Sequence, residues 1–125
     1  HSRKAEADVI DILERENMKK VVLHCFCGRK SLIKRAIEIG WCFSIHANIV
    51  RSQQFQDMVK MIPLQQLLTE TDAPFLSPYI DKDGKSIRNE PSFVIETIKI
   101  IAEIKGMTPE DIANIVFNNY QRLFL

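Results

Sequence analysis

Apolar residues recur along the chain in two alternating patterns. Between Lys4 and Glu16 they stand at Val9, Ile12 and Leu13 with acidic residues between them, and this spacing predicts an amphipathic helix. The following run, 21–26, is continuously apolar and rich in branched residues. Such a run is typical of a strand that is buried on both faces of a parallel sheet.

The same alternation continues to the end of the chain. Further helices are predicted at 29–39, 53–61, 91–105 and 108 to about 117, further strands at 41–47 and 66–71, and a loop at 78–86. Gly40 and Gly106 stand where left-handed residues end helices, and Thr108 precedes a proline as a helix N-cap does. Alternating strands and helices predict an α/β fold with a parallel sheet and right-handed crossovers.

Chemistry in such sheets gathers at the carboxyl ends of the strands. His24, His46 and Asp72 stand at strand ends, and His1 could end a strand that precedes the chain. Imidazole nitrogens and carboxylate oxygens are usual ligands of a catalytic divalent cation, which lowers the pKa of a water so that hydroxide attacks at neutral pH. The pattern therefore indicates a metal site.

Composition excludes other classes of protein. Of the 125 residues, 46% are hydrophobic and 26% charged, which is ordinary for a globular domain and unlike disordered or collagen-like chains. A formal charge of +1 creates no global field for a polyanion, so affinity for nucleic acid must come from a local cluster. An odd set of 3 cysteines and no signal peptide favour reduced thiols and a cytoplasmic location.

Several motifs resemble those of the TatD-like metal-dependent deoxyribonucleases. The segment 67–76, LLTETDAPFL, is similar to the family's ETDxPxL signature. His1-Ser2-Arg3 is similar to HSR, 24–28 (HCFCG) to HCFSG, 88–91 (RNEP) to RNEP, and 118–124 (NNYQRLF) to the family's closing N-x-x-R-L-F. These matches stand in the family's order and cover the chain from end to end.

The resemblance implies a role for each matching residue. His1, His24 and Asp72 would be metal ligands, and Asp72 would also act as the general base on the attacking water. The implied cofactor is a divalent metal in a two-metal site: zinc, magnesium or manganese. The substrate-binding residues would be Arg3 and Arg88, whose guanidinium groups suit phosphate oxygens, with Asn89 and Glu90 shaping the rim.

The fold that the resemblance implies is a (β/α)₈ TIM barrel of the metallo-dependent hydrolase type. Such a barrel needs about 200 residues or more, so residues 1–125 are expected to form a single segment, its C-terminal half. The family's H-x-H pair and its metal-bridging glutamate have no counterpart here. Since the chain opens on His1 without an initiator methionine, we interpret it as trimmed, and expect the missing N-terminal half or a self-associated copy as a partner.

Some residues have competing interpretations. His46 could line the same site or be a polar residue at a strand end. Glu70 is expected to alternate away from Asp72 and to support backbone or position substrate without binding the ion, or to be a salt-bridged residue of the barrel. His24 with Cys25 and Cys27 could form a metal clip, although the spacing is not that of zinc loops. Arg88, finally, could be an exposed loop residue before a helix whose N-terminus Asn89 or Glu90 caps.

Three hypotheses on function follow. The first is a divalent-metal-dependent deoxyribonuclease that cleaves DNA phosphodiester bonds with a metal-activated water, active only as an intact barrel. The second is a related metallo-hydrolase acting on an ester or amide, because similar barrels act on many substrates. The third is a catalytically incompetent half-barrel that serves as an interaction module.

Overall fold

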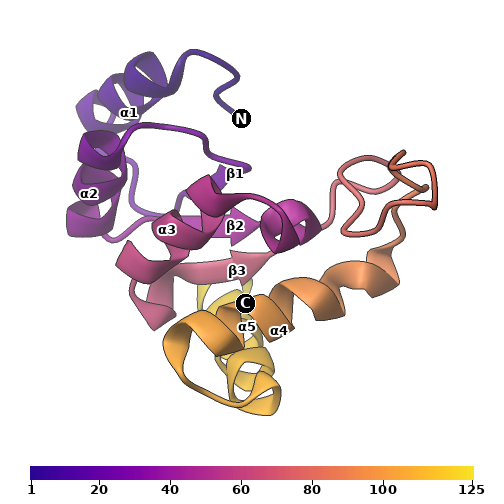
Figure 1. Ribbon diagram of the computed structural model, residues 1–125. Helices are drawn as coiled ribbons and strands as arrows, with labels where there is room; N and C mark the ends of the chain where they lie inside the picture. The colour runs from indigo at the N-terminus through magenta and orange to yellow at the C-terminus, as the bar shows by residue number, and fades with distance from the viewer.

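The strands form one parallel sheet in the computed structural model, which describes residues 1–125 (Figure 1). The order is β1 (Val22–His24), β2 (Cys42–Ile45), β3 (Leu67–Thr69), and both neighbouring pairs run parallel. The predicted α/β class and strand direction are confirmed. Each strand is shorter than predicted, because the chain turns out of the sheet soon after its last apolar residue.

The predicted helices are present, and α2 (Lys30–Ile39) and α3 (Gln53–Met61) connect the strands. The others are α1 (Glu6–Arg15), α4 (Val94–Lys105) and α5 (Pro109–Phe124), with short 3₁₀ turns η1 (Ala47–Val50), η2 (Leu64–Gln66) and η3 (Pro91–Phe93). The segment at Pro91 therefore starts as 3₁₀ and becomes α-helical at Val94. None of these helices has both the length and the apolar character needed to cross a bilayer.

Helix α5 runs beyond its predicted end near Phe117 to Phe124. The helix continues through its polar second half because the buried amide of Asn119 donates hydrogen bonds of 2.7 and 2.8 Å to the carbonyls of Leu64 and Leu67. A polar residue in the sequence is here a tertiary anchor. It holds the last turns of α5 against the start of β3.

The predicted helix ends are confirmed where backbone geometry decides them. Gly40 ends α2 with a φ of 92° and Gly106 ends α4 with a φ of 65°, the left-handed conformation that glycine adopts without steric cost. At the start of α5 the Thr108 hydroxyl accepts a hydrogen bond from the Asp111 N–H at 3.1 Å. Asp111 also adds negative charge in the first turn.

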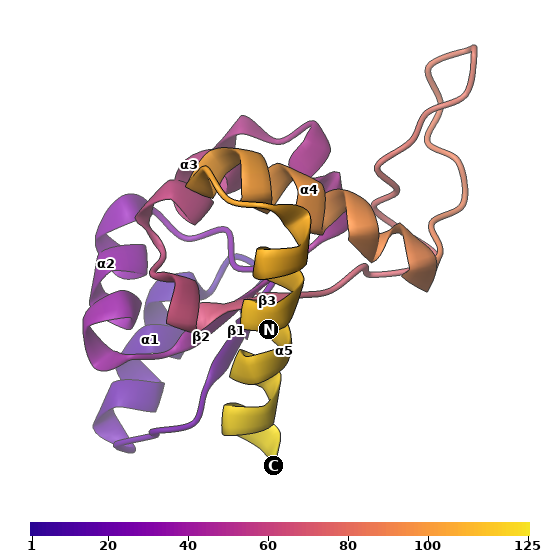
Figure 2. The same cartoon turned by 90° about the horizontal axis from the view of Figure 1, so that it is seen from below.

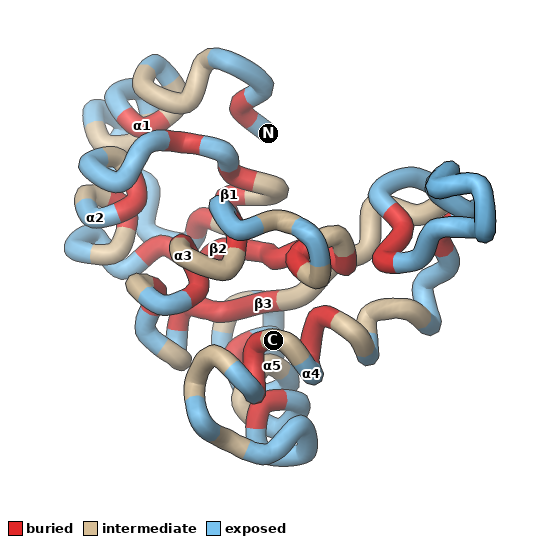
Figure 3. The backbone as a smooth tube through the Cα atoms, in the orientation of Figure 1, coloured by how far each residue is buried: buried red, intermediate tan, exposed pale blue.

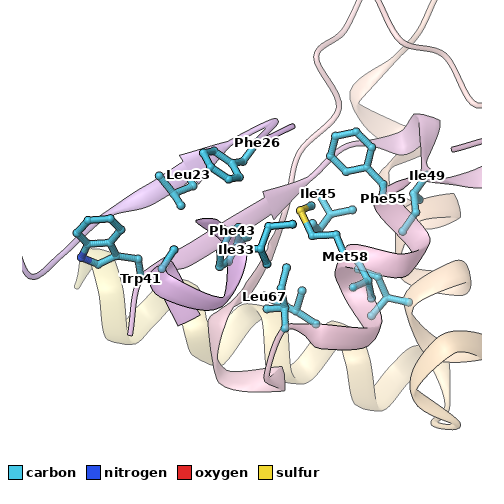
Figure 4. Close-up of a cluster of buried hydrophobic side chains, with 14 of the residues drawn as sticks. Leu23, Phe26, Ile33, Trp41, Phe43, Ile45, Ile49, Phe55, Met58 and Leu67 are labelled. Atoms are coloured by element: carbon cyan, nitrogen blue, oxygen red, sulfur yellow. The ribbon is translucent and has the colours of Figure 1, made fainter. Parts of the chain in front are cut away.

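One face of the sheet forms the hydrophobic core with the surrounding helices (Figure 4). Phe43 and Ile45 of the central strand are fully buried and share this face, as residues two apart on a strand do. Phe26 meets Phe43 edge-on at 6.1 Å between ring centroids. The Trp41 indole is buried and donates to the Met18 carbonyl at 2.9 Å.

The other face of the sheet carries polar residues near the strand ends. In the parallel register His24 of β1 lies beside Ser44 of β2. Glu70 follows β3, and its N–H donates to the Ile45 carbonyl at 2.9 Å. Since Ser44 stands between Phe43 and Ile45, its side chain points to the face opposite the core.

A long loop follows the strands at their carboxyl ends. The segment after β3 projects away from the body of the molecule before returning to α4 (Figure 2), and most of it is exposed (Figure 3). Ile80 and Ser86 form an isolated antiparallel bridge at the base of its tip. The predicted loop at 78–86 is thereby confirmed.

Candidate metal centre

His24 and Asp72 meet at the carboxyl ends of β1 and β3. Nε2 of the His24 imidazole lies 3.3 Å from Oδ1 of Asp72. Both side chains are partly accessible, with 38% and 27% of their surface exposed, so an ion or substrate can reach them from solvent. The structure brings together two of the residues that the sequence predicts as ligands.

The Glu70 carboxylate contacts the other nitrogen of the same imidazole, Nδ1 of His24. The same oxygen, Oε2, accepts a 2.6 Å hydrogen bond from the Ser44 hydroxyl. The expectation that Glu70 alternates away from Asp72 is wrong: β3 ends at Thr69 and Asp72 has a left-handed backbone, so strand alternation does not extend to these residues, and their donor atoms lie within 4.8 Å of each other. Glu70 acts on a side chain, by orienting His24.

His1 and Arg3 line the same cavity as His24 and Asp72. The cavity has a volume of about 400 Å³, within the range usual for ligand sites. The His1 and His24 rings lie 5.6 Å apart between centroids. The three residues expected to hold metal and one of the expected phosphate-binding arginines thus surround a single opening.

The chain turns sharply where the site residues stand. Asp72 has a φ of 55° and Cys25, directly after His24, a φ of 45°. Left-handed backbone costs energy for residues with a Cβ, and such positions cluster at functional sites. The turn at Cys25 directly follows β1, and the turn at Asp72 comes shortly after the end of β3.

The donor set fits a divalent cation. Donor atoms of His24, Glu70 and Asp72 all lie within 4.8 Å of one another. Oε1 of Glu70 is buried without a hydrogen-bond partner, and burial raises the pKa of the Glu70 carboxyl above its usual value, assisted by the Asp72 charge. A cation near these carboxylates would offset both the buried charge and their mutual repulsion.

Asn89 lies beneath the loop that carries Asp72. Only 2% of its surface is exposed, and its amide donates hydrogen bonds of 2.6 Å to the carbonyls of Thr71 and Phe75. Its Oδ1 accepts from the Glu90 N–H at 2.9 Å. These bonds occupy the amide, so we interpret Asn89 as a positioning residue that fixes Asp72; direct contact with substrate stays a prediction.

Arg88 and Glu90 are exposed on either side of Asn89. Arg88 lines a second cavity next to the one that contains His24 and Asp72. Glu90 precedes η3 and makes no side-chain bond to the backbone there. Their contacts with substrate stay predictions.

His46 has a structural role. It is buried, its Nδ1 accepts a hydrogen bond from the Asn48 N–H at 3.1 Å, and its ring packs edge-on against Phe55 with 4.2 Å between centroids. Burial lowers the pKa of the His46 imidazole, which favours the neutral ring whose Nδ1 accepts that bond. Of the two interpretations open in the sequence, the polar residue at a strand end is the one that the geometry supports.

The cysteines are free thiols outside the donor set. Burial raises the pKa of the Cys25 thiol to about 12, and its sulfur is not among the donor atoms that lie together at His24 and Asp72. The exposed Cys27 points its sulfur to the Cys25 carbonyl at 3.5 Å. The geometry does not support a clip of His24 with these two residues.

Arg51 is a candidate functional residue that the sequence did not reveal. It stands after η1, and its Nη2 donates to the Ser77 carbonyl at 2.6 Å. It lines the second cavity together with Arg88. A basic residue at the end of a short 3₁₀ turn carries no motif, and only the return of the long loop brings the two arginines together.

Comparison with known proteins assigns the chain to a family. The family model described as TatD related DNase matches residues 1–125. The deoxyribonuclease TATDN3 of Homo sapiens is 37% identical over 99% of this chain and 43% of its own length. The metal-dependent hydrolase YabD of Bacillus subtilis, described as uncharacterized, is 38% identical over 99% of this chain and 49% of its own.

Solved structures agree on the fold. The TatD homologue YJJV of Escherichia coli superposes with a TM-score of 0.81 at 24% identity, over 97% of this chain and 47% of its own. A TatD family hydrolase of Entamoeba histolytica gives 0.78 at 22% identity, over 98% and 48%. The chain thus spans about half the length of the relatives that it matches. Because the family model covers the whole of it, the chain belongs to the TatD related DNase family.

Proposed function

We propose that the protein containing this chain is a divalent-metal-dependent deoxyribonuclease, and that the chain supplies the C-terminal half of its (β/α)₈ barrel. The observation that carries the proposal is the meeting of His24 and Asp72, with Nε2 and Oδ1 3.3 Å apart, at the carboxyl ends of parallel strands. This is the edge of a barrel where catalysis takes place. The name of the TATDN3 relative supports DNA as the substrate.

His24 and Asp72 would hold the cation together with His1, which lines the same cavity. Glu70, whose donor atoms lie close to those of His24 and Asp72, would stand beside the ion and orient His24. Glu70 contacts Nδ1 of His24, so Nε2, which lies 3.3 Å from Oδ1 of Asp72, would be the ligating nitrogen. A carboxylate on the far nitrogen of a ligating imidazole fixes its tautomer and raises its basicity. The contact of Glu70 with His24 supports His24 as a ligand and Glu70 as the group that would orient it.

The bound cation would lower the pKa of the attacking water and polarise the phosphoryl group. Asp72 would take the proton of that water on its carboxylate and hold it during bond cleavage. Arg3, in the same cavity, and Arg88, in the adjoining one, would bind phosphate oxygens and orient the DNA backbone. Glu90 would form part of the rim, and Asn89 would keep the Asp72 loop in place.

The remaining half of the barrel would come from the same protein or from a second copy of this chain. The chain spans 43% of the length of the TATDN3 relative, and β1 and β3 are the edges of a sheet with only one neighbour each. Unpaired strand edges favour pairing with further strands.

The three free thiols support a cytoplasmic location.

The proposal is tested on the intact protein from its natural source gene. Metal content is measured by mass spectrometry, and cleavage of labelled DNA is measured with zinc, magnesium or manganese added to the metal-free protein. We expect metal-dependent cleavage that Asp72→Asn lowers at least about 100-fold, as loss of a catalytic base does. The matched control, Asp83→Asn on the exposed loop tip, should cleave at the wild-type rate.

Other outcomes would identify a different function. Hydrolysis of esters or amides with DNA left intact would replace the nuclease by a related metallo-hydrolase. Absence of bound metal and of every hydrolytic activity in the intact protein would favour an interaction module.

A further inference from the structure

A second cavity of about 500 Å³ adjoins the metal centre. Phe75 and Leu76 line both cavities and form the boundary between them. On the far side of this boundary stand Arg51 and Arg88, with Ile87 beside them. An aromatic ring and two guanidinium groups therefore lie next to the place where the phosphodiester would be cleaved.

Phe75 is exposed although its backbone is firmly held. Solvent reaches 73% of the surface of Phe75. Its N–H donates to the Asp72 carbonyl at 2.8 Å, and its carbonyl accepts the 2.6 Å bond from the buried Asn89 amide. The ring is thus presented to solvent from a fixed base, three positions after a proposed metal ligand.

Arg51 is also held in place with donors to spare. Its Nη2 donates to the Ser77 carbonyl at 2.6 Å and its Nε to Oδ1 of Asn48 at 3.3 Å. A guanidinium has five N–H donors, so these two bonds orient the group and leave others for an anion. Such fixation lowers the entropy lost on binding.

We propose that this second cavity is a nucleotide subsite, in which an unpaired base next to the cleaved bond stacks on Phe75 and its phosphate binds Arg51 and Arg88. The proposal rests on the proposed nuclease function and assigns to it two residues, Phe75 and Arg51. Stacking on an aromatic face accepts any base, because every base has a π-face. The base must be unpaired to reach the ring.

Charge complementarity selects this occupant. A purely apolar partner would leave two guanidinium groups desolvated without a counter-charge, which is costly. A nucleotide supplies an aromatic plane for the ring and an anion for the arginines. Since Phe75 lines both cavities, one strand can span them, with one phosphate at His24 and Asp72 and the next at Arg51.

The first test maps the stacked base with the intact, metal-loaded protein. A single abasic position is moved along a short single-stranded oligonucleotide, and kcat/KM for cleavage is measured for wild type, Phe75→Ala and Phe75→Trp. In wild type one abasic position next to the cleaved bond should lower kcat/KM about 5- to 150-fold, the usual effect of one stacked base. Phe75→Ala should lose this sensitivity, and it should cleave the normal strand as poorly as wild type cleaves the abasic strand. Phe75→Trp should retain the sensitivity to the abasic position.

The matched control is Ile80→Ala, an exposed apolar residue of the same loop outside the cavity, which should behave as wild type.

The second test measures how binding of the same strand depends on salt. Each phosphate contact contributes about 0.7 to the slope of log K against log salt for single strands. Arg51→Gln should lower the slope by about that amount, whereas the exposed Arg15→Gln should leave it unchanged.

The outcomes separate this inference from the nuclease proposal. If the protein cleaves DNA and Phe75→Ala keeps the wild-type abasic profile, the subsite is overturned and the nuclease stands. The same holds if Phe75→Ala lowers the melting temperature without changing the profile, because the ring then packs against the rest of the barrel. If no DNA is cleaved with any metal, the nuclease proposal itself fails and the subsite fails with it.

Discussion

The Ser44 hydroxyl lies 2.6 Å from Oε2 of Glu70 and donates a hydrogen bond to it, and the same oxygen contacts Nδ1 of His24. The contacts link the three strands of the sheet, because Ser44 belongs to β2, His24 to β1, and Glu70 follows β3. The orientation of the His24 imidazole therefore depends on a residue of the central strand that belongs to none of the sequence motifs.

Loss of this link should weaken metal binding. Groups that orient a ligating histidine contribute about 10- to 100-fold to metal affinity or activity, so we expect Glu70→Gln to lower zinc affinity of the intact protein by that factor. Ser44→Ala should have a smaller effect in the same direction. Affinity is measured by competition with a chelator. An unchanged affinity in both variants would show that Glu70 does not orient His24.

Asn89→Ala should destabilise the protein by about 1–3 kcal/mol. The substitution removes the buried Asn89 amide and leaves the partly buried carbonyls of Thr71 and Phe75 without their donor, and the cost of losing such bonds has this size. Urea denaturation of the intact protein measures it.

The exposed neighbour provides the control. Glu90→Ala should change stability by no more than about 0.5 kcal/mol, as surface substitutions usually do. Equal stability of wild type and Asn89→Ala would mean that the amide does not hold the Asp72 loop.

Gly28→Ala should destabilise through a clash with one core residue. A Cβ at Gly28 would overlap the ring of Phe26, of which 1% is exposed. Overpacking of a close-packed core costs about 1–3 kcal/mol, and we expect a loss of this size in thermal unfolding. In a Phe26→Leu background the same glycine substitution should cost less; an equal cost in both backgrounds would argue against the clash.

Local patterns were sufficient to predict the elements of the fold. Periodic apolar residues predicted the helices and strands, and Gly40 and Thr108 marked ends that the structure confirms. These local patterns could not predict the end of α5, because it depends on the hydrogen bonds from Asn119 to the carbonyls of Leu64 and Leu67. That contact joins segments more than fifty positions apart, and no local pattern contains it.

The site was predictable only where motifs stand in one segment. His24 ends β1 and Asp72 follows β3. A parallel sheet brings the carboxyl ends of its strands to one edge, so the proximity of the two side chains could be expected. Ser44 and Arg51 could not be found in this way. Their roles arise from the register of β2 and from the return of the long loop, both of which are tertiary.

The buried His46 should make stability depend on pH. Burial lowers the pKa of its imidazole in the folded state, while in the unfolded chain the group has an ordinary pKa of about 6.5. Below that value the unfolded state therefore binds more protons, and stability falls as the pH decreases. His46→Asn keeps a side chain that can cap η1 and removes the titrating group. Urea denaturation of both proteins between about pH 5 and pH 8 should give a smaller loss of stability at low pH for the variant, whatever its absolute stability. Parallel pH profiles for the two proteins would mean that His46 does not stay neutral in the folded state.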